Sequence, residues 1–180
     1  QSKKLFFSEK RVDEINTQTI FFFFFTNLIS EGGKINERDF LDRAELLCSL
    51  GQTVMITNFQ EYYKLIDYFS EFTTERLGLA MGITNLIQIF DEKYYRNLSG
   101  GILEAFGKLF YKDLKIYLYP SKDQETGELI TSKNVKVHPR MKELYKYFKY
   151  NNRLVDIEDY KPEILEIYSR TVYKMIAHDK

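Results

Sequence analysis

Five residues in this sequence have the types and positions best suited to holding a ligand. Two asparagines each follow a short apolar run, and a Ser-Gly-Gly sequence precedes a segment of helical period. Amide side chains hydrogen-bond small ligands, and the free backbone amides at a helix N-terminus bind anions such as phosphate. We therefore predict ligand-binding roles for Asn58, Asn85, Ser99, Gly100 and Gly101. Helix capping and turn formation are the alternative role for the two asparagines.

The glycines at 101 and 107 do not complete a phosphate-binding loop. Such a loop needs Gly, four residues and then Gly-Lys-Ser/Thr, whereas five residues separate Gly101 from Gly107 and Leu109 replaces the hydroxyl. Lys108 could supply a counter-charge, but it is more simply explained as an exposed helix residue. No G-x-G-x-x-G sequence follows an apolar run either. These residues therefore identify neither a cofactor nor a catalytic group.

A dense charged segment offers acid-base chemistry instead. It contains Asp91, Glu92, Lys93, Tyr94 and Arg96. Two carboxylates could transfer protons or hold magnesium. Neighbouring side chains on a helix point in different directions, so a solvated face with local ion pairs is the simpler interpretation.

A row of basic residues marks one side of a predicted helix. Lys142, Lys146, Lys149 and Arg153 recur at helical spacing and, with Arg140, could receive an acidic partner. Such rows are usually solvent-facing surface, which is the alternative here.

The composition argues against several classes of protein. The chain has 26 basic and 26 acidic residues, and a net charge of zero gives no field to attract nucleic acid. One cysteine, Cys48, and two distant histidines, His138 and His178, cannot build a zinc site. The longest apolar run, Ile20–Phe25, is far shorter than the roughly 20 residues of a membrane-spanning helix. We expect a soluble, cytoplasmic protein that holds no metal and binds neither nucleic acid nor membrane.

The elements that must position these residues alternate between strand and helix. Three short apolar runs, at 53–58, 77–82 and 114–119, are separated by segments of helical period. This alternation is typical of a parallel sheet covered by helices. We predict one α/β domain over 1–180, a three-layer sandwich with a short, mainly parallel, Rossmann-like sheet. Its parts are a helical lead-in at 1–50, a strand-helix core at 51–120, and a loop and C-terminal helices at 121–180.

The three runs are expected to lie side by side, so that the loops after them meet in a common hollow. The continuous run at 53–58 predicts a strand buried on both faces, joined by a right-handed crossover to the run at 77–82. The run at 114–119 alternates apolar and polar residues, which places it nearer a sheet edge.

Helices are predicted on either side of this core. Residues 9–31 form a helix or, alternatively, a loop and a strand through Ile20–Phe25, because a continuous apolar run has no period; we favour the helix. A helix capped by Asn36 ends at Gly51 and carries Cys48 on its buried stripe. A polar excursion at 120–137 contains a short hairpin, and two helices follow, over 141–148 and from Pro162 onward.

Similarity to a known family is concentrated in four segments: 39–51 (DFLDRAELLCSLG), 57–64 (TNFQEYYK), 89–95 (IFDEKYY) and 99–107 (SGGILEAFG). They resemble the C-terminal part of bacterial proteins commonly labelled nicotinate-nucleotide adenylyltransferase, and in some cases TonB-dependent receptor. The resemblance covers nearly the whole chain and implies a further N-terminal portion. Nucleotidyltransferases of this class carry H-x-G-H and a later S-x-T-x-x-R. This chain has no H-x-G-H, and Ser169-Arg170-Thr171 lacks the spacing, so no catalytic residue is carried over.

These observations predict binding of a nucleotide or another phosphorylated metabolite at the strand carboxyl edge. The resemblance implies that the chain is then one portion of an enzyme similar to nicotinate or nicotinamide mononucleotide adenylyltransferases. The alternative is a non-catalytic protein-interaction or oligomerisation module. Its 14 Tyr and 15 Phe residues could form a self-association surface, because aromatic side chains are favoured at interface cores.

Overall fold

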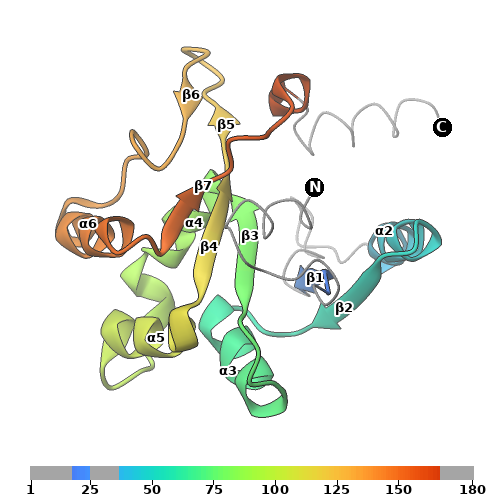
Figure 1. Cartoon of the computed structure of the whole chain (residues 1–180), viewed down its shortest axis with the longest axis horizontal. Helices are drawn as coiled ribbons and strands as arrows, with labels where there is room; N and C mark the ends of the chain where they lie inside the picture. The colour runs from blue at the N-terminus through green and yellow to red at the C-terminus, as the bar shows by residue number, and fades with distance from the viewer. Residues whose placement is uncertain (1–17, 25–36, 167–180) are drawn as a thin grey trace. The chain divides into compact units, whose positions relative to one another are not determined.

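The computed structural model describes residues 18–24 and 37–166 of the chain (Figure 1). Short, mainly parallel sheets flanked by helices confirm the predicted α/β fold. The chain divides into two compact units, Gln1–Thr74 and Glu75–Lys180. The expectation of a single domain stays a prediction.

In the first unit, β1 (Ile20–Phe24) pairs in parallel with β2 (Thr53–Thr57) along its full length. The favoured helix is therefore wrong at 20–24, and the alternative strand is confirmed. A run of phenylalanines has no helical period, and here pairing with β2 supplies the strand's backbone partners. Residues 9–17 and 25–31 of the same prediction lie outside the described residues.

The partner of β2 corrects two further expectations. Because β2 pairs with β1 in a two-stranded sheet, the predicted crossover from β2 to the run at 77–82 within one sheet is wrong. The strand is also not buried on both faces, since the Ile56 side chain is 47% exposed. A continuous apolar run indicates a strand, but it does not determine which strand pairs with it or how many layers cover it.

In the described part of the first unit, two helices accompany this pair of strands. The predicted helix before Gly51 is confirmed as α2 (Glu37–Ser49), whereas its proposed cap, Asn36, lies outside the described residues. Cys48 is exposed, so the prediction that it is a core residue is wrong; Ala44 of the same helix is buried. The second helix, α3 (Tyr62–Phe72), buries Tyr63, Leu65 and Ile66.

The second unit contains a three-stranded parallel sheet in the order β3 (Gly78–Gly82), β4 (Lys115–Tyr119) and β7 (Leu154–Asp156). Leu79 is opposite Ile116, which is opposite Leu154 on the far side. The expected parallel pairing of the runs at 77–82 and 114–119 is confirmed. The expectation that all three predicted runs share one sheet is wrong, because β7 takes the third place.

The middle position of β4 overturns its predicted place near an edge. Ile116, Tyr117 and Leu118 are all buried, with Tyr117 only 4% exposed. The alternation of apolar and polar types was misleading because a tyrosine ring packs as well as an aliphatic side chain. Sequence analysis missed β7, since a three-residue strand is too short to show a period.

Three helices connect these strands: α4 (Ile83–Ile89), α5 (Gly101–Leu109) and α6 (Lys142–Tyr150). Both crossovers step in the same direction across the sheet, so right-handed connections place the helices on one face. They meet in an aromatic cluster of Phe90, Phe106, Phe110, Tyr145 and Phe148. Phe110 and Phe148 stack with ring centroids 4.1 Å apart.

Short elements complete the chain. The predicted hairpin is confirmed as β5 (Ser121–Lys122) and β6 (Leu129–Ile130), and α6 confirms the predicted helix over 141–148. The 3-10 turns are η2 (Glu92–Tyr95), η3 (Tyr111–Asp113), η4 (Pro139–Met141) and η5 (Pro162–Glu166). The helix predicted from Pro162 is described only as η5. Within the described ranges, no helix is both long and apolar enough to cross a membrane.

Two adjacent residues of α4 test the assignment of the core. Leu86 is fully buried, whereas Ile87 is 41% exposed. We expect Leu86→Ala to lower the free energy of unfolding by about 2–5 kcal/mol, because it removes buried contacts and leaves a cavity. Ile87→Ala should cost no more than about 1 kcal/mol. Urea unfolding followed by circular dichroism measures both, and equal losses would contradict this assignment of the buried face.

Candidate functional site

The five predicted ligand residues are distributed over both units. Asn58 follows β2 in the first unit and is exposed. Asn85 lies inside α4, which begins directly after Gly82 at the end of β3, and its side chain is half-buried. No loop therefore separates this strand from its helix. Ser99 is exposed just before α5, and Figure 1 shows α5 near the start of β4, away from the end of β3.

The Gly-Gly sequence at the start of α5 already holds an oxyanion from its own helix. The Gly100 amide donates a hydrogen bond of 2.9 Å to Oε2 of Glu104. A Cβ on Gly100 would lie 2.8 Å from the Glu104 Cβ, and Gly101 has a φ of +57°, so this entry to the helix favours glycine at both positions. A phosphate at this place has to displace the Glu104 carboxylate.

Beyond the carboxyl end of β7 lies a polar cluster that sequence analysis missed. It consists of Ser132, Tyr145, Lys149 and Asp156, and we call it the Ser132 cluster. Both Asp156 oxygens accept hydrogen bonds from Ser132, at 2.9 Å from its amide and 2.7 Å from its hydroxyl. The four residues come from a loop, a helix and a strand, and no local spacing in the sequence joins them.

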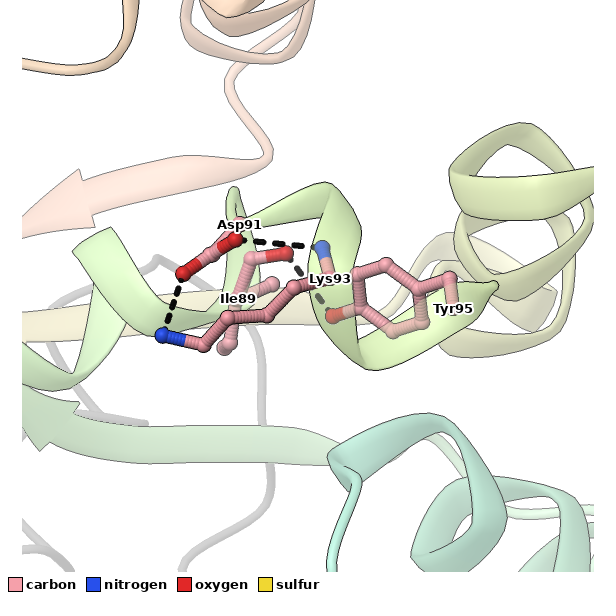
Figure 2. Close-up of polar contacts among 4 residues, drawn as sticks. All are labelled: Ile89, Asp91, Lys93 and Tyr95. Carbon is pink, nitrogen blue, oxygen red and sulfur yellow. Dashed lines mark hydrogen bonds and ion pairs between the residues drawn. The ribbon is translucent and has the colours of Figure 1, made fainter. Parts of the chain in front are cut away.

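The charged segment after α4 forms a local cap (Figure 2). Asp91 Oδ1 accepts from the Lys93 amide at 3.1 Å, and Asp91 Oδ2 lies 2.7 Å from Lys93 Nζ. The buried Tyr95 hydroxyl donates to the Ile89 carbonyl oxygen at 2.8 Å. Both Asp91 oxygens are thus engaged with Lys93, as expected for a face with local ion pairs. In the part of the chain that the structure describes, no group of three or more His, Cys, Asp and Glu residues could hold a metal ion.

A hollow of the second unit lies between α5, η3 and α6. We call it the α5–α6 groove, and its volume is about 490 Å³. Phe106, Phe110 and Phe148 of the aromatic cluster form a buried floor, while Leu103 and Tyr147 are exposed walls. The remaining lining residues are Gly107, Asp113, Leu144, Asn151 and Arg153. Its position beside η3, which leads into β4, puts it at the amino ends of the strands rather than at the predicted carboxyl ends.

One ion pair lies among the lining residues of the α5–α6 groove. Arg153 Nη2 lies 2.8 Å from Asp113 Oδ1, and Arg153 Nη1 donates to the Leu114 carbonyl oxygen at 3.4 Å. The Asp113 side chain is 83% exposed, against 25% for Arg153.

Three non-glycine residues beside this groove have a left-handed backbone conformation. They are Lys112 (φ 45°), Asp113 (φ 60°) and Asn152 (φ 55°). Asn152 ends α6 in a turn where the Arg153 amide bonds the Phe148 carbonyl oxygen at 2.9 Å, a normal helix ending. The left-handed conformation costs more free energy at Lys112, because lysine, unlike asparagine, is not among the residues that adopt it readily. Strain of this kind concentrates at functional sites, which supports the groove as the candidate site.

Three of the five residues of the predicted basic row are paired within the second unit, and the other two, Arg140 and Lys142, are exposed. Lys146 Nζ is 2.7 Å from Glu143, Lys149 Nζ donates to the Ser132 carbonyl oxygen, and Arg153 pairs with Asp113. Sequence analysis did not predict the groove, because its walls, Leu103 and Tyr147, belong to two helices that are far apart in the chain. An exposed leucine or tyrosine on an otherwise amphipathic helix was the available signal.

The cap at Asp91 predicts a pH dependence. The side-chain hydrogen bond from Lys93 lowers the pKa of Asp91 from its ordinary value of 3.8, with the Lys93 amide and charge acting in the same direction. A pKa lowered by folding gives stability that is present above the unfolded pKa and is lost as pH falls through the folded pKa. In an NMR titration, Lys93→Met should move the Asp91 midpoint upward.

Asp123 supplies the internal control. Its pKa is lowered by the amides of Thr126 and Glu125, so Lys93→Met should leave it unchanged. An Asp91 midpoint that does not respond to Lys93→Met would show that the Asp91–Lys93 ion pair is absent in solution.

Comparison with known proteins gives no relative from which a function could be inferred. No family model, curated protein or solved structure matches this chain. The resemblance to proteins labelled nicotinate-nucleotide adenylyltransferase stays a prediction, and the site must be interpreted from its own geometry.

Proposed function

We propose that the second unit is a protein-interaction module whose α5–α6 groove receives an amphipathic helix from a partner protein. The observation that carries this proposal is the contrast within the groove. Leu103 and Tyr147 are 66% and 62% exposed above a floor of buried phenylalanines. Aromatic residues are enriched in interface cores, and a groove between two helices suits the apolar face of a third.

The polar groups of the groove favour binding over catalysis. Among its lining residues the charged side chains are Asp113 and Arg153, and they bond each other. General acid-base work requires a titratable group that can reach the substrate's proton and is not committed elsewhere. An ion pair in the groove lining instead sets the direction in which a partner can lie.

Asp113 indicates the charge of that partner. It uses Oδ1 for Arg153, and its highly exposed side chain leaves the other side of the carboxylate open to solvent. A lysine or arginine near one end of the partner helix can therefore contact it. Such an exposed pair contributes at most about 1 kcal/mol to affinity, and its main effects are orientation and association rate.

A matched pair of tyrosines on α6 tests the groove. Tyr147 lines it, whereas Tyr150 is 92% exposed and does not. Selection of a displayed library of random short peptides on the full chain should enrich amphipathic helical sequences with leucine or aromatic residues and a terminal basic residue. Tyr147→Ala should then raise the dissociation constant of a selected peptide about tenfold or more, because wall aromatics act as hot spots. Tyr150→Ala should leave it unchanged.

Asp113→Asn tests the charge contact in the same assay. Asparagine tolerates the left-handed backbone, so this change removes the charge with little change of shape. We expect slower association and a smaller effect of salt. Equal peptide binding by wild type and Tyr147→Ala would reject the groove. A concentration-dependent dimer in light scattering that Tyr147→Ala abolishes would make a second copy of the chain the occupant.

Binding of a nucleotide or another phosphorylated metabolite is the second proposal. It is supported by the Glu104 carboxylate on the Gly100 amide, a position that accommodates an oxyanion. Under this proposal ATP, NMN or nicotinate mononucleotide raises the melting temperature, since a ligand stabilises the state it binds. Glu104→Ala should enlarge the shift because it removes the competing anion, and Glu143→Ala, on the exposed face of α6, should not. The absence of any shift in wild type and Glu104→Ala would reject this proposal.

A further inference from the structure

Ser132 joins three segments of the second unit through four hydrogen bonds. It is 4% exposed and lies in the loop after β6. Its amide and hydroxyl donate to Asp156 at the end of β7. Its carbonyl oxygen accepts from the Tyr145 hydroxyl and from Lys149 Nζ, both at 2.7 Å and both from α6.

These bonds suit a fixed structural contact. Burial, and after it the charge of Asp156, raises the pKa of Tyr145 to about 12, so the phenol stays protonated and donates at neutral pH. A carboxylate and an ammonium group take part in the other bonds, and hydrogen bonds to charged groups are the stronger ones. The loop, α6 and β7 are thereby held at one residue.

The same helix presents different residues to the α5–α6 groove. Tyr145 and Lys149 lie one turn apart and bond Ser132, whereas Leu144, Tyr147 and Asn151 line the groove. Residues three and four apart share a side of a helix, so these two sets occupy neighbouring sides of α6, with the groove residue Phe148, three residues from Tyr145, between them. Phe148 also stacks on Phe110. Stacked rings restrict the rotation of a helix less than hydrogen bonds do, because the strength of a hydrogen bond falls steeply as its angle departs from linear.

We propose that Ser132 is a positioning residue for the α5–α6 groove. By tying α6 to the end of β7, it sets the rotation of the helix and hence the separation of the wall at Tyr147 from the wall at Leu103. Its functional consequence rests on the proposed interaction module, while the positioning itself is a property of the fold. The two bonds to α6 are accepted by the Ser132 carbonyl oxygen, so loss of their donors on Tyr145 and Lys149 changes the groove without touching any residue that lines it.

The separation of the two helices can be measured without any partner. Spin labels are placed through Leu103→Cys on α5 and Tyr150→Cys on α6 in a Cys48→Ser background, because both sites are exposed and Cys48 is the only other cysteine. Electron paramagnetic resonance gives the distribution of distances between the labels. We expect Tyr145→Phe and Lys149→Met, each of which removes one donor to the Ser132 carbonyl oxygen, to shift or broaden this distribution, and the double variant to do so most. Thr126→Ala, which removes a hydroxyl from the turn between β5 and β6 that accepts a hydrogen bond from the Glu128 amide, should not.

Ser132→Ala removes one of the two bonds from Ser132 to Asp156 and provides a milder variant should loss of a bond to α6 prevent folding. A distribution that is unchanged in Tyr145→Phe, Lys149→Met and their double variant overturns the inference, as does an equal change in Thr126→Ala. The peptide assay separates this inference from the proposed function. A shifted distance distribution without any groove-binding peptide leaves the positioning role standing and rejects the interaction module.

Discussion

The second unit depends on the pairing of β4 along both of its edges. Ile116, Tyr117 and Leu118 are buried, and buried backbone groups must be hydrogen-bonded. Pairing with β3 on one side and β7 on the other meets that requirement, as in the bonds from the Ile116 amide to Arg153 and from the Ile157 amide to Leu118. Because all three strands run in the same direction, each connection must return over a face of the sheet, and the helices that do so carry the aromatic cluster.

This arrangement also explains why the groove lies at the amino ends of the strands. Ligands of open parallel sheets gather at the carboxyl edge where the strand order reverses. In the sheet of β3, β4 and β7 both connections step the same way, so within it no reversal opens a crevice. The loop after β6 covers the end of β7 through Ser132, whereas the ends of α5 and α6 leave a hollow floored by Phe110 and Phe148.

Local patterns predicted the elements better than their partners. Helical periods identified α2, α3, α5 and α6, and the apolar runs at 77–82 and 114–119 identified the β3–β4 pair, because each signal lies within a few neighbouring residues. The partner of β2 and the existence of β7 depend on contacts between distant residues. Phenylalanine runs and a three-residue strand carry no period from which these contacts could be derived.

The candidate site was beyond sequence reasoning for the same reason. Gly100 and Gly101 were predicted to contact a ligand. The positive φ of Gly101 and the close approach of Glu104 to Gly100 already explain why glycine occupies both positions. Tyr147 and Leu103 belong to separate helices and define a groove only after the sheet has brought α5 and α6 together. The Ser132 cluster likewise joins a loop, a helix and a strand.

Nuclear Overhauser contacts between backbone protons of the strands test the account most directly. With β4 in the middle, we predict a parallel pattern of contacts from Leu79 to Ile116 and from Ile116 to Leu154. Contacts that instead pair residues 53–57 with residues 78–82 or 115–119, or that show an antiparallel pattern at Ile116, would contradict the sheet on which the groove depends.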